Sequence, residues 1–472
     1  MSLDPDDWEA FDEQAHAALD IALAHLRERA KGGGPVWTPM PDEARAAVGG
    51  SLPLEGRPLH EVLGRMRQDI LPYPTGNVHP GFFGWVHGGG SAAGLIAEML
   101  AAAMNANCGG RDHAAIEVER QVVRWCAEVF GLPADTAGGI LVTGTSQATV
   151  QAVHAARVAL LGRESRERGA AAGLTGYASA RGHACLAKAF ELCGIGSGAM
   201  RKVPVDEHHR MRLDLLSDMI AQDREAGLTP LLVAGTAGTV DAGACDDLSG
   251  LADVAASQRL WMHVDGAFGA WLRIAGEPLA SKVAGIERAD SLAFDFHKWM
   301  NVPYDAGCLL VHEEQRLADA FSARPDYLAA GGEALGGGDP WPCEFGIDLS
   351  RGFRALKVWT QMVHYGLDRL GETVAESCRV AARLGEMVEE ADGLSLAMPV
   401  QANVCCFFVD GLDDAGHRNL CARIQASGAA APSTTVIDGR TCLRAALVNH
   451  RTTERDVRKL VDAALALKDA CT

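Results

Sequence analysis

Apolar residues recur in this chain in two patterns, with helical spacing in some stretches and as short unbroken runs in others. Between residues 80 and 350 the short runs alternate with the helical stretches. This alternation predicts an α/β domain with a largely parallel sheet, in which chemistry collects at the carboxyl ends of the strands. The predicted strands cover residues 138–144, 175–180, 230–238, 260–267, 291–296 and 307–312.

The two ends of the chain have a different pattern of apolar residues. Residues 7–29 and 59–70 have the spacing of amphipathic helices but too few apolar residues for a core of their own. We therefore expect residues 1–79 to form a helical segment that packs on a partner subunit. Residues 351–472 combine a long helix, two strand patterns and a closing helix. They predict a small α+β domain that follows a large domain at 80–350.

Charge and cysteine content narrow the classes of function. The chain has 43 basic and 61 acidic residues, a formal net charge of −18, which argues against nucleic acid or a membrane surface as a partner. Its 13 cysteines contain no C-x-x-C pair and no set of metal ligands is evident, so we expect reduced thiols and no metal. An acidic N-terminus without signal-peptide features, and the lack of a long apolar run, predict a cytoplasmic location.

Side chains with useful chemistry follow three of the predicted strands. Asp265 lies at one strand end, Lys298 follows the next strand, and the turn at 144–146 opens a helix. Taken singly, these are an ordinary strand-end carboxylate, a surface lysine and a helix cap. Together they supply an anion for a cationic ring, an amine for an aldehyde and a phosphate cradle, which is the set that pyridoxal phosphate requires. His183 could stack on such a ring or merely cap a helix.

Several longer motifs carry a resemblance to a known family. The chain resembles the pyridoxal-dependent decarboxylases of the aromatic-amino-acid and glutamate decarboxylase group (group II) across nearly its whole length. The resemblance implies the aspartate-aminotransferase fold (fold type I) and a homodimer with shared active sites. The motifs are HPGFFGW at 79–85, TGTSQATVQA at 143–152, GTAGTVDAGACDDL at 235–248, HVDGAFGAW at 263–271, DFHKWMNVPYD at 295–305, RPDYL at 324–328 and FRALKVW at 353–359.

The resemblance also implies a role for each matching residue. Lys298 is expected to form the Schiff base with the cofactor, Asp265 to pair with the ring nitrogen and Ala267 to pack against the ring. His183 is expected to stack on the opposite face, and Tyr327 to protonate the product after carbon dioxide leaves. The residues expected to hold the phosphate or the ring hydroxyl are Thr145, Ser146, His297, Ser291 and Thr239. Those expected near the substrate are Trp85, Tyr304 and Arg111.

The implied reaction is decarboxylation of an L-amino acid to the amine and carbon dioxide, with an aromatic substrate slightly favoured. One alternative is another reaction on the same fold, such as aldehyde synthesis. A second is an acidic substrate, whose side chain Arg111 would bind.

Three positions depart from the family pattern: Asp295 replaces an asparagine, Phe296 replaces a proline, and Trp271 stands where aromatic-specific relatives have a small residue. An acid near the phosphate is unexpected.

Overall fold

The computed structural model describes residues 2–323 and 334–471, which form two compact units. The larger unit comprises Gly90–Arg379 and Val400–Val404. The smaller unit combines Met1–Gly89, Val380–Pro399 and Cys405–Thr472. The division into three parts near residues 79 and 350 stays a prediction.

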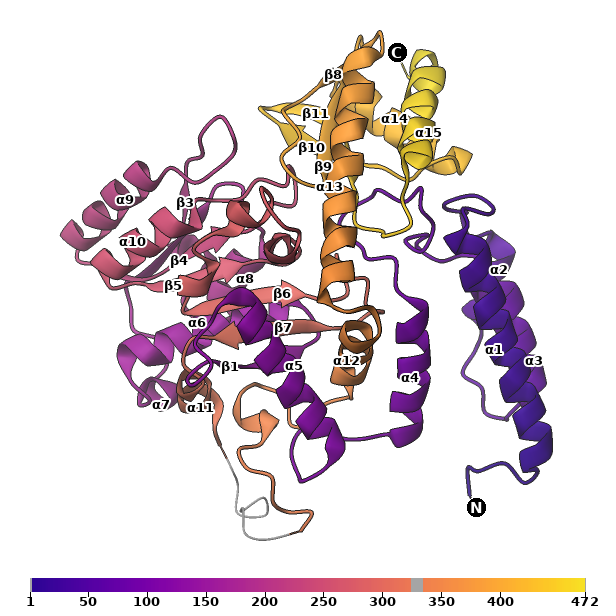
Figure 1. The fold of residues 1–472 in the computed structure, drawn as a ribbon, viewed down its shortest axis with the longest axis horizontal. Coiled ribbons are helices and arrows are strands. Elements are labelled where there is room, and N and C mark those ends of the chain that lie inside the picture. Colours follow the sequence, from indigo (N-terminus) through magenta and orange to yellow (C-terminus); the bar gives the residue numbers. More distant parts are fainter. Residues whose placement is uncertain (1, 324–333, 472) are drawn as a thin grey trace. The chain divides into compact units, whose positions relative to one another are not determined.

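A seven-stranded sheet forms the centre of the larger unit (Figure 1). Its strands lie in the order β1-β7-β6-β5-β4-β2-β3, and β7 alone runs antiparallel to its neighbours. The expected α/β class with a largely parallel sheet is therefore confirmed. The strands are β1 (Gly138–Val142), β2 (Leu174–Ser179), β3 (Met200–Val203), β4 (Thr229–Thr236), β5 (Trp261–Asp265), β6 (Ser291–Asp295) and β7 (Gly307–Val311).

Helices cover both faces of this sheet. Ala234 of β4 packs in a buried cluster with residues of α6 and α8, whereas a Cβ on the next residue, Gly235, would meet Leu248 and Leu251 of α10. Successive strand residues point to opposite faces, so α6 and α10 lie on opposite sides of the sheet. The helices of this unit are α4 (Ala92–Met104), α5 (Ala114–Phe130), α6 (Thr145–Leu161), α7 (Ser165–Arg168), α8 (Cys185–Leu192), α9 (Leu213–Glu225), α10 (Leu248–Gln258), α11 (Gln315–Phe321) and α12 (Arg354–Tyr365).

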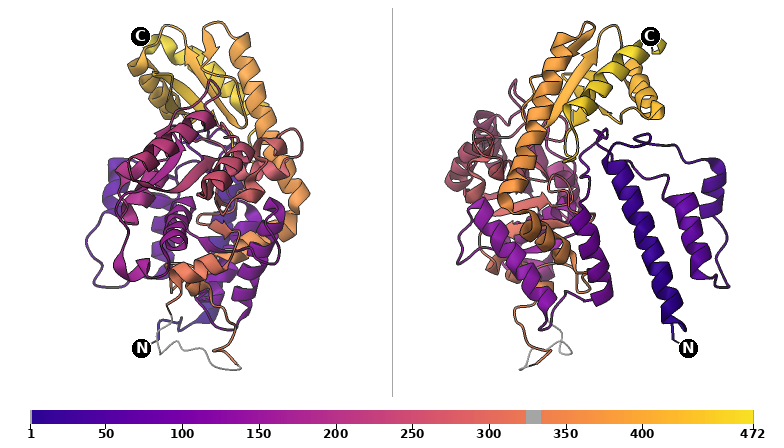
Figure 2. Two further views of the ribbon diagram at one scale, coloured as in Figure 1. Left: turned by 90° about the vertical axis from the view of Figure 1, so that its left-hand side faces the viewer. Right: turned by 45° about the vertical axis from the view of Figure 1, so that its right-hand side comes forward.

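The smaller unit contains a four-stranded sheet in the order β10-β11-β9-β8. Its elements are β8 (Leu394–Leu396), β9 (Val404–Val409), β10 (Ser433–Ile437), β11 (Arg440–Ala446), α14 (Asp414–Ser427) and α15 (Glu454–Leu467). Helix α13 (Leu367–Glu390) leads into it from the larger unit. The same unit includes α1 (Trp8–Ala30), α2 (Asp42–Val48) and α3 (Leu59–Arg65), and α1 and α3 run side by side (Figure 2).

Helix α1 covers the range expected to be helical, yet it buries no residue within this chain. Among the described residues, no helix combines the length and the apolar content needed to cross a membrane.

Candidate active site

Two carboxylates and one amine meet where β5 and β6 end. These strands are parallel neighbours, with Asp265 in register with Ala293, so their carboxyl ends lie at one edge of the sheet. The chain leaves β6 at Asp295 and reaches Lys298 three residues later. The Lys298 Nζ atom lies 2.8 Å from Asp295 Oδ2, and the lysine side chain is 23% exposed whereas the aspartate side chain is 2% exposed. Lys298 is therefore accessible from solvent but anchored to a buried anion.

The N-terminus of α6 faces Asp295 as well. The backbone N–H of Thr145 donates to Asp295 Oδ1 at 2.7 Å. The turn is closely packed, since a Cβ on Gly307 would lie 2.6 Å from the Gly144 Cα atom. Thr145 Oγ1 is buried and has no hydrogen-bond partner among the described residues, while Ser146 is exposed in the first helical turn. A helix N-terminus with an unsatisfied buried hydroxyl fits a phosphate group, which would supply the missing acceptor.

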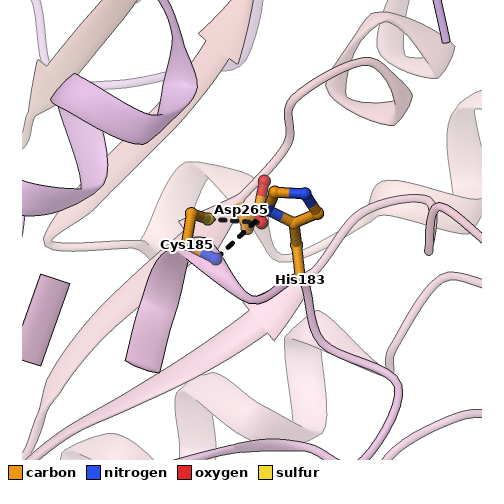
Figure 3. A group of neighbouring side chains, drawn as sticks. All are labelled: His183, Cys185 and Asp265. Carbon is orange, nitrogen blue, oxygen red and sulfur yellow. Dashed lines mark hydrogen bonds between the residues drawn. The ribbon is translucent and has the colours of Figure 1, made fainter. Parts of the chain in front are cut away.

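Asp265 forms a second cluster with two residues from the start of α8 (Figure 3). Asp265 Oδ1 accepts a hydrogen bond from the Ala267 N–H at 3.2 Å, and Oδ2 accepts from the Cys185 thiol at 3.8 Å. The Cys185 N–H donates to His183 Nδ1 at 3.2 Å, which orients an otherwise exposed imidazole. The buried Asp265 carboxylate fits a protonated ring nitrogen, because its negative charge would compensate a positive charge buried beside it.

Burial sets the protonation of the neighbouring side chains. It raises the pKa of the Cys185 thiol, and the adjacent Asp265 charge raises it further, so this thiol stays protonated and donates. Burial likewise lowers the pKa of His297, against the opposing effect of Asp295. His297 Nδ1 accepts the Ala306 N–H at 3.1 Å, and its ring lies 4.3 Å from the Tyr304 ring. The neutral form of His297 is therefore the one that the fold favours near pH 7.

Tyr304 extends the site outwards. It is half-exposed and lines an open cavity of about 450 Å³, whose other walls include Asn105, Asp305 and Arg354. Arg354 Nε donates to Asp305 Oδ1 at 2.8 Å. The expected substrate residue Tyr304 is thus placed between His297 and a cavity that a small molecule could enter.

Two further predicted residues lie at the same edge of the sheet. Ala267 lies two residues after Asp265, and its carbonyl accepts the Asp295 N–H at 3.0 Å. Thr239 lies in the turn that follows β4, whose last residue, Thr236, is in register with Asp265. The Thr239 hydroxyl is buried and accepts the Ala244 N–H at 3.1 Å, so it holds this turn together.

Ser291 is not brought to this edge. It opens β6 at the amino end, opposite to Asp295, and it is fully buried. Its hydroxyl accepts from Trp261 Nε1 at 2.8 Å and lies 2.8 Å from His263 Nδ1. The length of a strand separates it from the α6 N-terminus, because both ends of β6 are fixed by its pairing with β7. Ser291 therefore lies apart from the other residues expected to bind the phosphate.

The remaining predicted residues lie elsewhere or outside the described chain. Arg111 stacks its guanidinium 4.4 Å from the Trp341 ring centroid, so it already has an aromatic partner. Trp85 belongs to the smaller unit, where it stacks on His87 at 5.7 Å. Tyr327 lies outside the described residues.

The structure places one of the departures from the family pattern in the core and adds one residue to the site. Trp271 is fully buried, it donates to the Asp295 carbonyl at 3.1 Å, and it packs on Phe296 at 5.5 Å. The replacement of a proline by Phe296 is therefore matched by a core aromatic partner.

The sequence analysis did not identify Cys185, because a lone cysteine by itself does not indicate a functional site. A weak indication was its position two residues after His183, at a helix start.

Known proteins resemble this chain in sequence and in structure. Residues 41–410 match the pyridoxal-dependent decarboxylase conserved domain. The chain is 28% identical to an aromatic-L-amino-acid decarboxylase from Bacillus atrophaeus, over 98% of this chain and 96% of that protein. It is 29% identical to a 4-hydroxyphenylacetaldehyde synthase from Rhodiola rosea, over 89% and 86% of the two chains. A crystal structure of Oryza sativa TDC with PLP and tryptamine matches with a TM-score of 0.90 at 26% identity, covering 99% of each chain.

Proposed function

Because the chain belongs to the family of pyridoxal-dependent decarboxylases, we propose that it converts an aromatic L-amino acid into the corresponding amine and carbon dioxide. It is a carboxy-lyase whose cofactor is pyridoxal 5'-phosphate. The observation that carries the proposal is the placement of Lys298 and Asp265 after neighbouring parallel strands, beside the N-terminus of α6. That arrangement puts an amine, a buried anion and a phosphate cradle within one site.

Each residue then has a defined task. When bound, pyridoxal phosphate supplies an electron sink for the electron pair that remains on Cα as carbon dioxide leaves. Lys298 would hold the cofactor through its side-chain amine and would give up that position to the substrate amine. Asp265 keeps the ring nitrogen protonated through its buried negative charge. His183, oriented by the Cys185 N–H, presents a flat imidazole to the ring. The α6 N-terminus and Thr145 Oγ1 hold the phosphate.

The aromatic substrate class is supported by the relatives rather than by a single pocket residue. The Bacillus atrophaeus protein is an aromatic-L-amino-acid decarboxylase, and the Oryza sativa structure contains tryptamine. An acidic substrate would require a cation near the site, and the stacking of Arg111 on Trp341 engages the residue considered for that task. Aldehyde synthesis is the second candidate, because the Rhodiola rosea relative is a 4-hydroxyphenylacetaldehyde synthase.

The proposal includes a homodimer in the cytoplasm. Helix α4 exposes a row of apolar side chains at helical spacing, Ile96, Met99, Leu100 and Met104, and α1 buries no residue within its own chain. A second copy would cover such apolar surface. The thirteen cysteines, all within the described residues, form no disulfide with one another and most of them are buried, as is usual in a reducing compartment. Analytical ultracentrifugation tests the dimer; a monomer at micromolar concentration would contradict it.

The function is tested by product analysis. The purified protein with added pyridoxal phosphate is incubated with a panel of aromatic, acidic and other L-amino acids, and amines, aldehydes and peroxide are measured by mass spectrometry and a peroxide assay. We expect amines from aromatic substrates, and none from the Lys298→Ala variant. Aldehyde and peroxide as main products would favour the second candidate, and amine from glutamate alone would overturn the aromatic class.

A further inference from the structure

The carboxylate of Asp295 lies where the cofactor's phosphate is proposed to bind. Its Oδ1 atom takes the Thr145 N–H at 2.7 Å, and its Oδ2 atom is 2.8 Å from Lys298 Nζ. The side chain is 2% exposed, so water does little to solvate its charge. The two groups that stabilise this carboxylate, a helix N-terminus and the lysine, are the same two groups that the proposed cofactor needs.

The other groups around Asp295 offer no replacement charge. On its own segment His297 Nε2 lies 3.7 Å from Asp295 Oδ2, but burial lowers the pKa of His297 and favours its neutral form. Burial raises the pKa values of Tyr304 and of Cys308 on β7, and the Asp295 charge adds to both effects, so these groups are neutral as well. Among the contacts described above, the only group of α6 that contacts Asp295 is the Thr145 N–H. Lys298 is thus the one cation that faces Asp295 in this set.

Cofactor binding would remove both sources of stabilisation at once. A phosphate ester carries a charge of about −1.5 to −2 near pH 7 and would occupy the α6 N-terminus. Lys298 would turn its amine towards the cofactor. An ionised Asp295 would then be buried beside a second anion with no partner, which is a costly arrangement for a charged group. A carboxylic acid in the same place could instead donate an O–H···O hydrogen bond to a phosphate oxygen.

We propose that Asp295 couples cofactor binding to the uptake of one proton. The proton comes from solvent and is shared between the Asp295 carboxyl group and a phosphate oxygen, and no covalent bond changes in this step. Asp295 acts as a positioning residue for the phosphate. When the proton arrives, Asp295 loses its negative charge and its ion pair with Lys298 is released. The inference rests on the proposed function, since it assumes that pyridoxal phosphate occupies this site.

Pyridoxamine 5'-phosphate is the probe that isolates the effect. It carries the same ring and phosphate but an amine in place of the aldehyde, so it forms no bond with Lys298. Isothermal titration calorimetry near pH 7.5, in two buffers with different ionisation enthalpies, gives the number of protons taken up per ligand bound. We expect the apoprotein to take up close to one proton more than the D295N variant. From pH 7 to pH 9 the wild-type Kd should rise by up to about tenfold per pH unit.

Controls separate this proposal from the function itself. D253N removes the same charge from an exposed position on α10, whose side chain is 73% exposed, and should bind the probe like the wild type. Equal proton uptake in the wild type and D295N would overturn the proposal and leave the decarboxylase function standing. If D295N does not fold, binding by the wild type without proton uptake overturns it equally. A protein that binds no probe and releases no carbon dioxide would contradict both.

Discussion

Arg351 and Glu119 form a buried ion pair beneath β1, the strand that leads to the α6 N-terminus proposed to hold the phosphate. Their side chains are 2% and 5% exposed, and Arg351 Nη1 donates to Glu119 Oε2 at 3.0 Å. Both also bind β1 directly: Arg351 Nη2 donates to the Leu141 carbonyl at 2.6 Å, and Glu119 Oε1 accepts the Leu141 N–H at 3.1 Å. Since β1 runs into Gly144, this pair fixes the position from which α6 begins.

Removal of one partner should therefore be strongly destabilising. In R351M the Glu119 carboxylate stays buried without its cation, and losses of about 3–5 kcal/mol are typical of such changes. We expect R351M to lower the free energy of unfolding by this amount in urea denaturation. R379M is the matched control, because Arg379 pairs with Glu376 on the surface and is 56% exposed; its effect should stay below about 1 kcal/mol. Similar losses in the two variants would contradict this account of the pair.

Asp265→Asn should separate cofactor binding from catalysis. The amide preserves the shape of the side chain but cannot balance the charge of a protonated ring nitrogen. Loss of one preorganised electrostatic group typically lowers the rate about 10²–10³-fold. We expect a fall of this size in kcat for amine formation, with pyridoxal phosphate still retained as measured by visible absorbance. The D253N variant should keep wild-type activity, and a D265N variant as active as the wild type would exclude the proposed role of Asp265.

The positions of Asp265 and Lys298 could be predicted because the strands of the sheet are easy to recognise in this chain. Short apolar runs located the strands that carry Asp265 and Lys298, and all six predicted strands have a counterpart in the sheet. The edge strand β3 was missed, since the charged pair Arg201–Lys202 separates Met200 from Val203 and leaves no continuous apolar run. A strand at the edge of a sheet buries few of its side chains, so its pattern of apolar residues is weak.

Contacts between distant segments could not be predicted in the same way. Nothing in the sequence near Asp295 indicates that its carboxylate reaches the Thr145 N–H, 150 residues earlier. The family resemblance assigned Ser291 to the phosphate, yet β6 begins at Ser291 and ends at Asp295, so this hydroxyl lies at the opposite end of the strand. Trp271 follows Asp265 closely but turns into the core against Phe296. In each case the direction of a side chain is decided by tertiary packing rather than by sequence position.

Cys185 should resist alkylation in the folded protein. Its side chain is buried, and burial together with the Asp265 charge raises the pKa of its thiol, so almost no reactive thiolate forms at neutral pH. We expect mass spectrometry after brief maleimide treatment at pH 7.5 to find Cys185 unmodified in native protein and modified in urea. Rapid modification of Cys185 in native protein would show that the cluster around Asp265 is open.

His263 should make the stability of the protein depend on pH. It lies in β5, fully buried beneath Asp265, and burial lowers its pKa from 6.5 to about 4. The folded state therefore holds His263 neutral, whereas the unfolded chain takes up a proton as the pH falls below 6.5. The stabilising contribution is complete above pH 6.5 and is lost progressively as the pH falls towards 4. Between pH 7.5 and pH 5.5 the loss should be about 1.4 kcal/mol.

A non-titrating variant isolates this effect from the other groups that titrate in the same range. H263Q is expected to be less stable than the wild type at pH 7.5, because it disturbs the hydrogen bond to Ser291, but its stability should change less on acidification. The measured quantity is the difference between wild-type and variant unfolding free energies at pH 7.5 and 5.5, which should shrink by about 1 kcal/mol or more. H16Q, at an exposed position on α1, should follow the wild type at both values. A difference between H263Q and wild type that is independent of pH would mean that His263 is not held neutral by its burial.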